Sequence, residues 1–597
     1  MLRPLAALTR IIRRTPPCPS CGRPVPDHSV KCRAEIRLPA GDPGLRVDRR
    51  DVRATRIAGD LIGLSVILIA AVALRGYWVI QHATVLEGNG CEYVRIAENL
   101  IKHGAYVGLY EGPELMFPPF FPISLALGSL LTGSVDSAAR LVPVISGVLL
   151  VPAVFTLARL MYSPRVALFA AALIAFHPLL IDLSSVALSE GTYLLLMVMA
   201  LYWGLRSLDS GRPGHTVWCG AILGLACLTR PEAVFYPFVI LAAALLKDLR
   251  QPAFVKRFAL RALCLLAPIV VLVAPYVLYE SVHAGSLRLE GKALINYTIG
   301  VRISSGMSAY EAATGIGPDL SEDGPQLSPN TFVATNKRKV SLRELFDYWI
   351  ASAERNKAPL LYQLLISPVF GSVLAIALIT LGLLRRPWTQ RRAQHESVLL
   401  GVAMGHLLLL LGVHFINSRY LLPLVPLSLL WVAQGIDGAA RWGVGTAGRC
   451  GLPTRRVHTA IHCVLIVAVV LLAAWGLRWG SLQDQNPRTL LLKDIRAWLG
   501  EYHPGPKRVM TDDIRIPYYS GGTFLQMPYA DAALALRYVH QKHPDFIVLV
   551  GGEPYLAPYL EQWLREGIPD RAAKLIYRAG PASPAVVMIY EWQDLEH

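Results

Sequence analysis

The stretch Leu61-Ile-Gly-Leu-Ser-Val-Ile-Leu-Ile-Ala-Ala-Val-Ala73 decides the fold class, because it contains no charged side chain. Similar apolar blocks run from Leu266 to Val277 and from Val464 to Trp475. Each block lies in a segment of about 20 residues with few charges, which is the length that crosses the hydrocarbon core of a bilayer. The sequence therefore predicts a polytopic α-helical membrane protein.

The composition of the whole chain agrees with that class. Of its 597 residues, 53% are hydrophobic and 17% are charged, whereas about a quarter are charged in a typical soluble protein. The net charge of +16 can indicate nucleic acid, but here Lys and Arg collect in short loops between apolar segments. We therefore expect a lipid bilayer, and no nucleic acid, as a partner. The nine cysteines are mostly isolated, so no disulfide framework is predicted.

The basic loops predict the topology, because loops rich in Lys and Arg stay in the cytoplasm. Four such loops and the basic arm before Ile57 are placed there, which puts the alternating loops and the C-terminal part outside. To keep the alternation, residues 119–161 must cross an odd number of times, either once with a re-entrant piece or in three short crossings. The total is then about 11 or 13 spans. The four basic loops are 206–215, 247–261, 385–392 and 441–456.

Three regions are expected along the chain. Residues 1–55 form a cytoplasmic arm without a cleavable signal peptide, because the first strong apolar run starts only near Ile57. Residues 56–482 form the membrane module, which includes a first loop (81–118) and a long loop (283–358), both outside. Residues 483–597 are predicted to form a small extracytoplasmic α/β domain, since short β-rich runs alternate with helical patterns there.

The first loop is the most informative polar stretch. It reads Leu86-Glu-Gly-Asn-Gly-Cys-Glu-Tyr-Val-Arg-Ile-Ala-Glu-Asn-Leu100 and closes with Met116-Phe-Pro-Pro-Phe-Phe-Pro122. Apolar residues from Tyr93 onward recur at helical spacing, which predicts an amphipathic helix along the membrane surface. That helix would hold Glu87 and Glu92 near the lipid headgroups. The simpler reading is that both are solvated loop residues.

Further polar groups are predicted on the same side. Glu190 begins a span, where an acid can also simply complement the helix dipole. Arg230 and Arg419 lie between apolar segments, where a cation needs a partner or reaches the headgroups, and the arginine fork suits phosphate. Lys292 begins the long loop. Acids suit a general base and cations suit an anionic leaving group, and transfer from a lipid-linked phosphosugar needs both.

The order of these motifs resembles that of the GT-C membrane glycosyltransferases, in particular bacterial members of glycosyltransferase family 39 such as protein O-mannosyltransferases and lipid A aminoarabinose transferases. The resemblance covers roughly residues 57–480. It implies transfer of a hexose or pentose from a polyprenyl-phosphate donor to a lipid, glycan or protein acceptor outside the bacterial inner membrane, usually with inversion. The motifs that carry it are the first-loop acids, the Tyr–Ile-Ala–Asn-Leu helix, Pro-Pro-x-x-Pro, Ser-Glu, Thr-Arg-Pro and Arg-Tyr-x-x-Pro.

The resemblance also implies roles for single residues. An acid of the first loop would act as the base, but the place where the family often has Asp is here Asn89, so Glu87 or Glu92 would take that role, and Glu87 is favoured because glycine exposes it. Glu190 would contact a substrate sugar. No metal or other cofactor is expected for catalysis. The expected substrate-binding residues are Asn89, Tyr93, Arg230, Lys292, His414, Arg419 and Tyr420.

The arm carries a partial zinc-ribbon pattern. Cys18-Pro-Ser-Cys21-Gly is a good metal knuckle, and Cys32 with His28 would complete four ligands. The second knuckle lacks its partner cysteine, because Glu35 stands in that place. The arm thus holds a structural zinc site, holds a degenerate knuckle, or is simply disordered.

Two other function classes fit an apolar chain of this kind. A transporter or flippase would handle a lipid-linked substrate without chemistry, but such proteins tend to show internal repeats and charges at the membrane midplane. Here no repeat is evident, and the charges collect at one face. The bundle could also serve only as an anchor for the C-terminal domain, although that domain shows no evident catalytic constellation.

Overall fold

The computed structural model describes most of the chain beyond residue 48. Its contacts divide the chain into two compact units, Met1–Gly59 and Asp60–His597. The site, the loops and the C-terminal sheet discussed below all belong to the second unit. The described residues are 49–82, 86, 88–249, 251–338, 340–366, 373–449, 454–477, 495, 498–551, 557–579 and 586–593.

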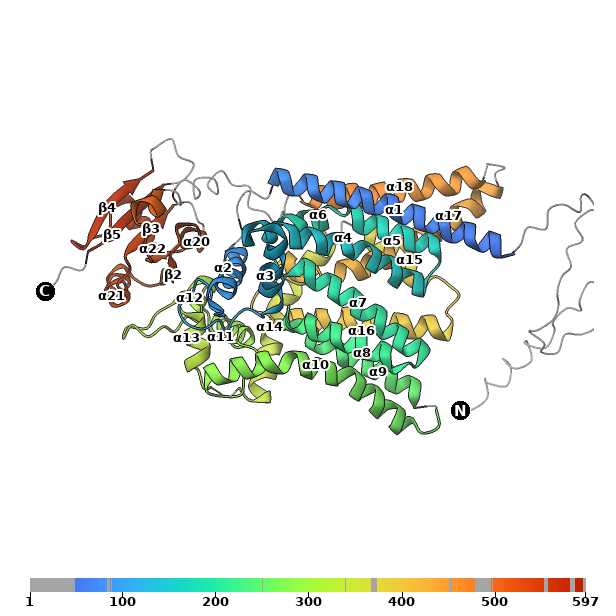
Figure 1. Ribbon diagram of the computed structural model, residues 1–597, viewed down its shortest axis with the longest axis horizontal. Coiled ribbons are helices and arrows are strands. Elements are labelled where there is room, and N and C mark those ends of the chain that lie inside the picture. The colour runs from blue at the N-terminus through green and yellow to red at the C-terminus, as the bar shows by residue number, and fades with distance from the viewer. Residues whose placement is uncertain are drawn as a thin grey trace, which may run out of the picture. The chain divides into compact units, whose positions relative to one another are not determined.

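Most of the second unit is helical (Figure 1). Short 3-10 turns connect several of the helices, namely η2 (Leu183–Ser185), η3 (Pro231–Phe235) and η4 (Ser418–Leu421). The helices of this part are α1 (Arg49–His82), α2 (Gly88–His103), α3 (Phe120–Thr132), α4 (Val135–Met161), α5 (Pro164–Phe176), α6 (Pro178–Asp182), α7 (Glu190–Ser210), α8 (Pro213–Cys227), α9 (Tyr236–Asp248), α10 (Phe254–Ala284), α11 (Lys292–Ser304), α12 (Ala309–Thr314), α13 (Pro329–Thr335), α14 (Leu342–Ile366), α15 (Val373–Leu384), α16 (Gln390–Leu411), α17 (Leu424–Arg449) and α18 (Thr454–Leu477).

Several of these helices are long and apolar enough to cross a membrane. Within the described residues there are five, and the bent pair Pro164–Phe176 with Pro178–Ser185 adds a sixth candidate. Three further apolar helices are shorter than 18 residues. The chain is therefore a multi-pass membrane protein, and the total of 11 or 13 spans stays a prediction. The five long helices are Ala58–His82, Val135–Met161, Glu190–Ser210, Phe254–Ala284 and Gln390–Leu411.

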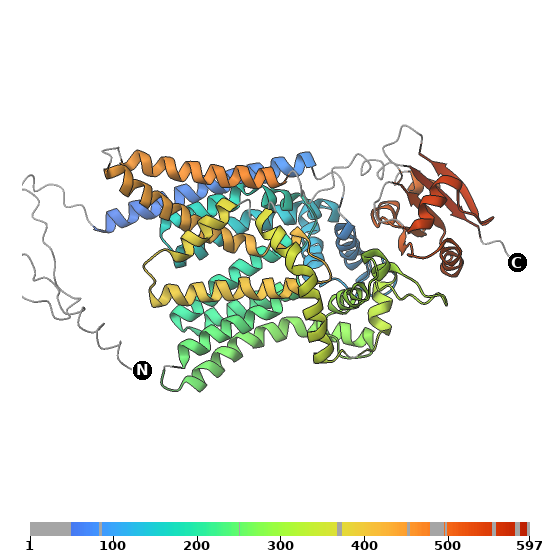
Figure 2. The same cartoon turned by 180° about the vertical axis from the view of Figure 1, so that it is seen from behind.

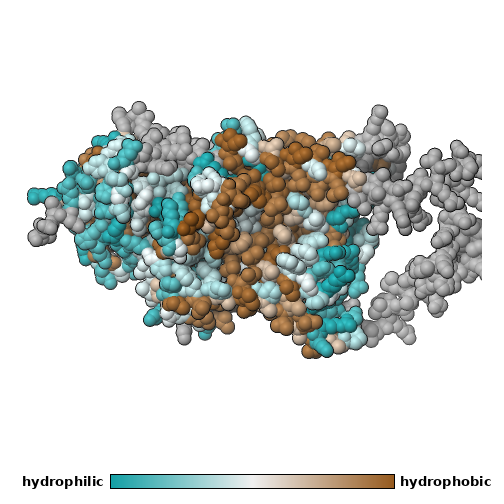
Figure 3. Space-filling view, viewed as in Figure 1, coloured by the Kyte–Doolittle hydropathy of each residue, from teal (hydrophilic) through white to brown (hydrophobic). Residues whose placement is uncertain are grey.

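The helices differ in how much of their apolar surface the protein covers. Within the apolar windows, 72% of the α7 residues are buried, against 11% for α1 and for α10. Helix α7 is therefore central, while α1 and α10 present apolar faces outward, as lipid-facing helices do. On the face shown in Figure 3, hydrophobic side chains gather over the helical bundle. Helix α4 packs against both α5 and α7, within the bundle that Figures 1 and 2 show from opposite sides.

A buried arginine stabilises the break between α5 and α6. Arg75 of α1 has no exposed surface, and its guanidinium donates to the carbonyl oxygens of Ala175 at 2.9 Å and Ile174 at 3.1 Å. The last carbonyls of a helix have no partner within that helix, and an unpaired one is costly in an apolar environment. Arg75 therefore stabilises the C-terminal end of α5. At this point the chain bends by 58° between α5 and the segment Pro178–Ser185.

The C-terminal part forms a five-stranded mixed sheet in the order β2-β1-β3-β5-β4. Strand β1 pairs in parallel with β2 and β3, whereas β5 is antiparallel to β3 and β4. The short β-rich runs on which the α/β prediction rests are residues 508–511, 546–550 and 585–590; they correspond to β1, to β3 and to most of β5. The elements are β1 (Arg508–Thr511), α20 (Arg515–Ser520), β2 (Thr523–Gln526), α21 (Ala532–Lys542), β3 (Phe546–Val550), α22 (Pro558–Glu566), β4 (Ala573–Arg578) and β5 (Val587–Trp592).

Both loops contact this sheet. In the first loop, the carbonyl of Leu109 accepts a hydrogen bond of 2.9 Å from the backbone N–H of Phe524, a residue of β2. In the long loop, Gly315 forms a parallel bridge with Tyr529. The α/β part is thus joined to the membrane module by its loops.

Candidate functional site

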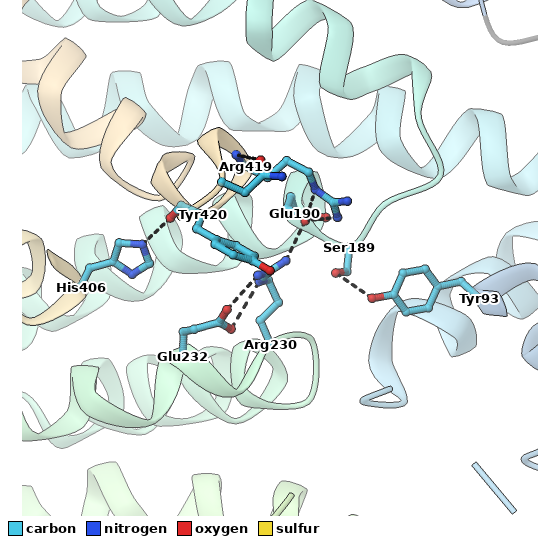
Figure 4. Close-up of polar contacts among 9 residues, drawn as sticks. Tyr93, Ser189, Glu190, Arg230, Glu232, His406, Arg419 and Tyr420 are labelled. Carbon is cyan, nitrogen blue, oxygen red and sulfur yellow. Dashed lines mark hydrogen bonds and ion pairs between the residues drawn. The ribbon is translucent and has the colours of Figure 1, made fainter. Parts of the chain in front are cut away.

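Glu190 lies at the centre of a buried ion-pair cluster at one end of the helical bundle. It is the first residue of α7, and only 3% of its surface is exposed. Its Oε1 is 2.8 Å from Nη1 of Arg230, and it accepts hydrogen bonds from Nε and Nη2 of Arg419 at 3.1 and 2.5 Å. Figure 4 shows Glu190 between the two arginines. Its Oε2 is buried and accepts no hydrogen bond from a described residue.

Arg230 is held from a second side as well. Glu232, in η3, accepts from Nη2 of Arg230 at 2.8 Å and from Nε at 3.3 Å. Burial opposes ionisation of Glu232, but Arg230 outweighs burial and lowers the pKa of this carboxyl. The guanidinium also lies over the ring of Tyr193, 5.9 Å from its centroid. Buried charges need partners of this kind, because an unpaired one is strongly destabilising.

Tyr93 connects this cluster to the first loop. Its hydroxyl lies 3.2 Å from Oγ of Ser189, the residue before Glu190. Its ring makes edge-to-face contacts with Phe117 and Phe121, both 5.0 Å away between centroids. Burial raises the pKa of Tyr93 to about 12, so the group stays a neutral hydroxyl at physiological pH. The Met116-Phe-Pro-Pro-Phe-Phe-Pro122 stretch therefore forms the aromatic wall on this side.

Two more cationic or imidazole groups lie near the cluster. The ammonium of Lys292, the first residue of α11, is 5.3 Å from the centroid of Phe117. Burial and the positive charge of Arg230 lower the pKa of Lys292. Burial, with Arg355 and Lys292 nearby, lowers the pKa of His414 to about 4, so the imidazole is neutral. Its Nδ1 is buried without a described partner.

Tyr420 follows Arg419, and its backbone carbonyl contacts a histidine of α16. Nε2 of His406 lies 2.7 Å from the backbone carbonyl oxygen of Tyr420 (Figure 4). The turn is further fixed by Asn417, whose side chain accepts from the backbone N–H of Arg419 at 3.0 Å. The Asn-Ser-Arg-Tyr stretch thus folds into η4 and aims Arg419 at Glu190.

An apolar pocket of about 250 Å³ lies beside the turn that precedes Arg230. Leu228, at the end of α8, lines it, and the carbonyl of Leu228 accepts from the backbone N–H of Phe120 at 2.9 Å. The pocket therefore lies where α3, α8 and α10 meet. Its other lining residues are Tyr106, Pro119, Ile123, Leu272, Pro275, Tyr276 and Tyr279.

Glu92 has a different environment from the Glu190 cluster. Its side chain is fully buried, and both carboxylate oxygens accept from the backbone N–H of Leu109, at 2.9 and 3.0 Å. Glu114 lies beside it, also fully buried, and accepts from the N–H groups of Met116 and Phe117. Burial and the neighbouring Glu114 raise the pKa of Glu92. Two carboxyls this close share a proton more readily than both ionise.

This carboxyl pair shapes the first loop. Gly108 passes so close that a Cβ there would be 1.7 Å from Oε1 of Glu92 and 3.1 Å from Oε2 of Glu114. The loop between α2 and α3 is therefore folded around the two acids. Glu92 is thus engaged inside the loop and makes no ion pair with Arg230 or Arg419, in contrast to Glu190.

The carboxyl pair predicts a pH dependence of stability. Burial raises the pKa of both Glu92 and Glu114 above the ordinary 4.5. A raised pKa means that the folded state holds its proton more tightly than the unfolded state, so stability is greatest below pH 4.5 and is lost as pH rises through the raised values. Glu92→Gln removes one of these protons from the equilibrium. The free energy of unfolding of Glu92→Gln, relative to that of the wild type, should therefore increase as the pH is raised, by up to about 1.4 kcal/mol per pH unit.

Thermal unfolding of the purified protein from pH 5 to pH 9 measures this effect. Glu98→Gln, on the same helix α2, serves as the control, and its curve should run parallel to that of the wild type. Parallel curves for Glu92→Gln and the wild type would show that the pair holds no extra proton.

The remaining predicted residues are placed as follows. Asn89 lies in the first turn of α2 and is half-buried. Glu87 lies outside the described residues, as do Cys18, Cys21, His28 and Cys32 of the predicted zinc site. Within the part of the chain that the structure describes, no group of three or more His, Cys, Asp or Glu side chains converges as metal ligands do.

Sequence reasoning did not select three further acids. Glu114, in the first loop, and Glu280, near the end of α10, are fully buried, and Glu290, just before α11, is half-buried. For Glu114 and Glu280 the available signal was a carboxylate in an apolar or aromatic stretch, since Leu-Met-Phe-Pro-Pro follows Glu114 and Pro-Tyr-Val-Leu-Tyr precedes Glu280. Spacing along the chain does not show that such distant acids approach one another.

Known proteins are similar to this chain in part of its sequence and in its fold. The family model of dolichyl-phosphate-mannose-protein mannosyltransferases matches residues 116–279. No curated protein sequence matches the chain.

Three solved structures share the fold. The Archaeoglobus fulgidus oligosaccharyltransferase in the apo form has a TM-score of 0.56 at 15% identity, covering 90% of this chain and 75% of its own. The archaeal oligosaccharyltransferase AglB from the same organism, in complex with an inhibitory peptide and a dolichol-phosphate, has a TM-score of 0.56 at 15% identity, covering 91% and 75%. ArnT from Cupriavidus metallidurans bound to undecaprenyl phosphate has a TM-score of 0.52 at 15% identity, covering 88% and 97%.

These similarities define a class. The chain has the fold of the GT-C membrane glycosyltransferases, and the resemblance predicted from the order of its motifs is confirmed. Within that class it resembles family 39, since the matched model, which covers α3 to α10, includes Glu190 and Arg230.

Proposed function

We propose that this protein transfers a sugar from a polyprenyl-phosphate donor to a lipid, glycan or protein acceptor at the extracytoplasmic face of the bacterial inner membrane. The observation that carries the proposal is the buried cluster of Glu190, Arg230 and Arg419 with Lys292 beside it. Three cations, Arg230, Arg419 and Lys292, lie close together in this cluster. A group of cations that includes two arginine forks suits the phosphate of the donor, both before transfer and on the departing lipid.

The apolar pocket supports a lipid-linked donor. It lies beside Leu228, two residues before Arg230, and only apolar and aromatic side-chain surface lines it. A phosphate held by Arg230 would place the first isoprene units close to this surface, which would bury them. Such a pairing of a cationic group with an apolar pocket suits an amphiphile rather than a free nucleotide sugar. Two proteins of the same fold were solved with dolichol-phosphate and with undecaprenyl phosphate bound, which agrees with a polyprenyl donor here.

The polar groups without partners suit the sugar and the acceptor. Oε2 of Glu190 and Nδ1 of His414 are both buried and accept nothing from the described residues. Buried acceptors of this kind are normally satisfied, and a sugar hydroxyl can satisfy them. We place Tyr93, Asn89 and Tyr420 around the same space. A carboxylate then takes the proton of the acceptor while the acceptor attacks the anomeric carbon from the side opposite the phosphate. This attack inverts the configuration of that carbon. In the first loop, Glu87 and Glu92 are the candidates for this carboxylate.

The orientation follows the basic loops, which keep the arm cytoplasmic and put the α/β domain outside. The contact of the sheet with both loops then brings the domain next to the site, where an extracytoplasmic acceptor would arrive. A structural zinc in the arm is part of the same proposal, and catalysis requires no metal.

The test is a transfer assay with the full chain in liposomes. The donors are labelled undecaprenyl-phosphate sugars, with several hexoses and one pentose, and the acceptor source is a detergent extract of bacterial membranes. We expect label to leave the donor for an extract component in proportion to enzyme. If every donor stays intact while labelled lipid crosses the bilayer, the protein is a transporter or flippase instead.

A further inference from the structure

The segment Glu290-Gly291-Lys292 is pressed against the first loop. A Cβ at Gly291 would lie 2.1 Å from the carbonyl oxygen of Leu115 and 3.0 Å from Cγ1 of Val333, so only glycine permits this approach. Gly291, in the first part of the long loop, is thereby packed against Leu115, the residue just before the aromatic wall. Such close backbone packing positions the two flanking charged side chains.

Only one carboxylate oxygen of Glu290 accepts a hydrogen bond from a described residue. Oε2 accepts from the backbone N–H of Ala293 at 2.6 Å, which orients the group at the start of α11. Oε1 is buried and accepts no hydrogen bond from a described residue. A buried carboxylate oxygen without a donor normally marks a place for an external donor or a proton.

A chain of contacts leads from Glu290 to the ion-pair cluster. Lys292 is two residues further on and lies over Phe117, Phe117 contacts the ring of Tyr93, and the Tyr93 hydroxyl contacts Ser189. Lys292 in turn is close enough to Glu190, Glu232 and Arg230 for each of them to shift its pKa. Glu290 therefore lies beside the proposed site, on the side of the long loop.

Glu190, Glu92 and Asn89, by contrast, have contacts or chemistry that oppose the role of proton acceptor. Glu190 is clamped by two guanidinium groups, which favour its ionised form and make it a weak base. Glu92 uses both oxygens on the N–H of Leu109 and lies against Glu114. Asn89 has a neutral amide and accepts no proton.

We propose that Glu290 is the general base of the transfer, with Lys292 and Gly291 as the residues that position it. This assignment rests on the proposed function. The acceptor oxygen forms a bond to the anomeric carbon as the bond between that carbon and the phosphate oxygen breaks. The bonding electron pair leaves with the polyprenyl phosphate, which Arg230 and Arg419 neutralise, and the acceptor proton passes to Oε1 of Glu290.

The electrostatic surroundings agree with this role. Burial raises the pKa of Glu290 to about 7, while Lys292 lowers it and Glu232 raises it; Glu280 is the other nearby acid. A base whose pKa lies near the working pH combines ionisation with proton affinity. The transfer rate should thus rise as the pH approaches about 7 and level off above it.

The experiment compares Glu290→Gln and Glu290→Asp with the wild type in the liposome assay. Glu290→Gln should lower kcat by about 10²–10⁴-fold, leave the donor KM and undecaprenyl phosphate binding unchanged, and remove the rise with pH. Glu290→Asp should recover part of the rate. Glu354→Gln, an exposed acid on α14, should behave as the wild type.

Each result decides the assignment. If Glu290→Gln retains the wild-type rate while the wild type transfers sugar, Glu290 is not the base and the proposed function stands; Glu87→Gln, measured in parallel, then tests the first loop. A loss of rate together with lost thermal stability and lost undecaprenyl phosphate binding shows a structural role and overturns the assignment. An inactive wild type refutes both the function and this inference.

Discussion

Replacing Arg230 by methionine is expected to destabilise the folded protein by about 3–5 kcal/mol. Glu190 and Glu232 both pair with this guanidinium in a buried cluster, and removal of one partner of a buried ion pair leaves uncompensated charge. Methionine keeps most of the apolar volume, so the loss reports charge rather than a cavity. Thermal unfolding of the detergent-solubilised protein measures it.

Two further variants separate the electrostatic cause from a packing defect. Arg343→Met changes an arginine whose side chain is 93% exposed and should leave the unfolding temperature unchanged. Arg230→Met combined with Glu232→Gln should recover part of the loss, because one orphaned charge is then removed. An Arg230→Met protein as stable as the wild type would mean that the three residues do not form a buried network.

The second large effect concerns lipid phosphate. Arg419→Ala is expected to weaken binding of undecaprenyl phosphate by about 10–150-fold, since a hydrogen bond to a charged group contributes about 1.5–3 kcal/mol. Arg419 gives Nε and Nη2 to Glu190, while Nη1 has no partner among the described residues and 27% of the side chain is exposed. It is therefore the cation of the cluster best placed to reach an arriving phosphate.

Binding of labelled undecaprenyl phosphate to the purified protein measures this loss. Lys292→Ala should add to it, because its ammonium lies on the opposite, aromatic side. Arg206→Ala, an exposed arginine near the other end of α7, is the control and should bind as the wild type. Equal affinity in Arg419→Ala and the wild type would remove Arg419 from the phosphate site.

Much of the membrane module was predictable, because long apolar runs have few structural alternatives. The apolar blocks 61–73 and 266–277 lie in α1 and α10, and the span predicted to begin at Glu190 is α7. Glu190, Arg230 and Arg419 were also predicted to share one face, since charges at the ends of apolar segments must find partners. The structure joins these three in direct ion pairs.

Other features depend on contacts that spacing along the chain does not reveal. Glu92 pairs with Glu114 across the first loop, which no periodicity indicates. Glu290 reaches the site because Gly291 packs on Leu115, more than 170 residues earlier in the chain. Strands β2 and β4 were not predicted. The four residues Thr523–Gln526 are too few to show an alternation, and no residue of Ala573–Arg578 is fully buried, so that strand has no buried face for the sequence to mark.

The central claim is that Arg230, Arg419 and Lys292 hold the phosphate of a polyprenyl-phosphate donor. An experimental density map of the full protein bound to undecaprenyl phosphate tests it most directly. The account predicts phosphate oxygens within hydrogen-bond distance of Arg419 and at least one of the other two cations, with the first isoprene units in the apolar pocket beside Leu228. A phosphate bound elsewhere, with these three side chains still paired only to Glu190 and Glu232, would contradict it.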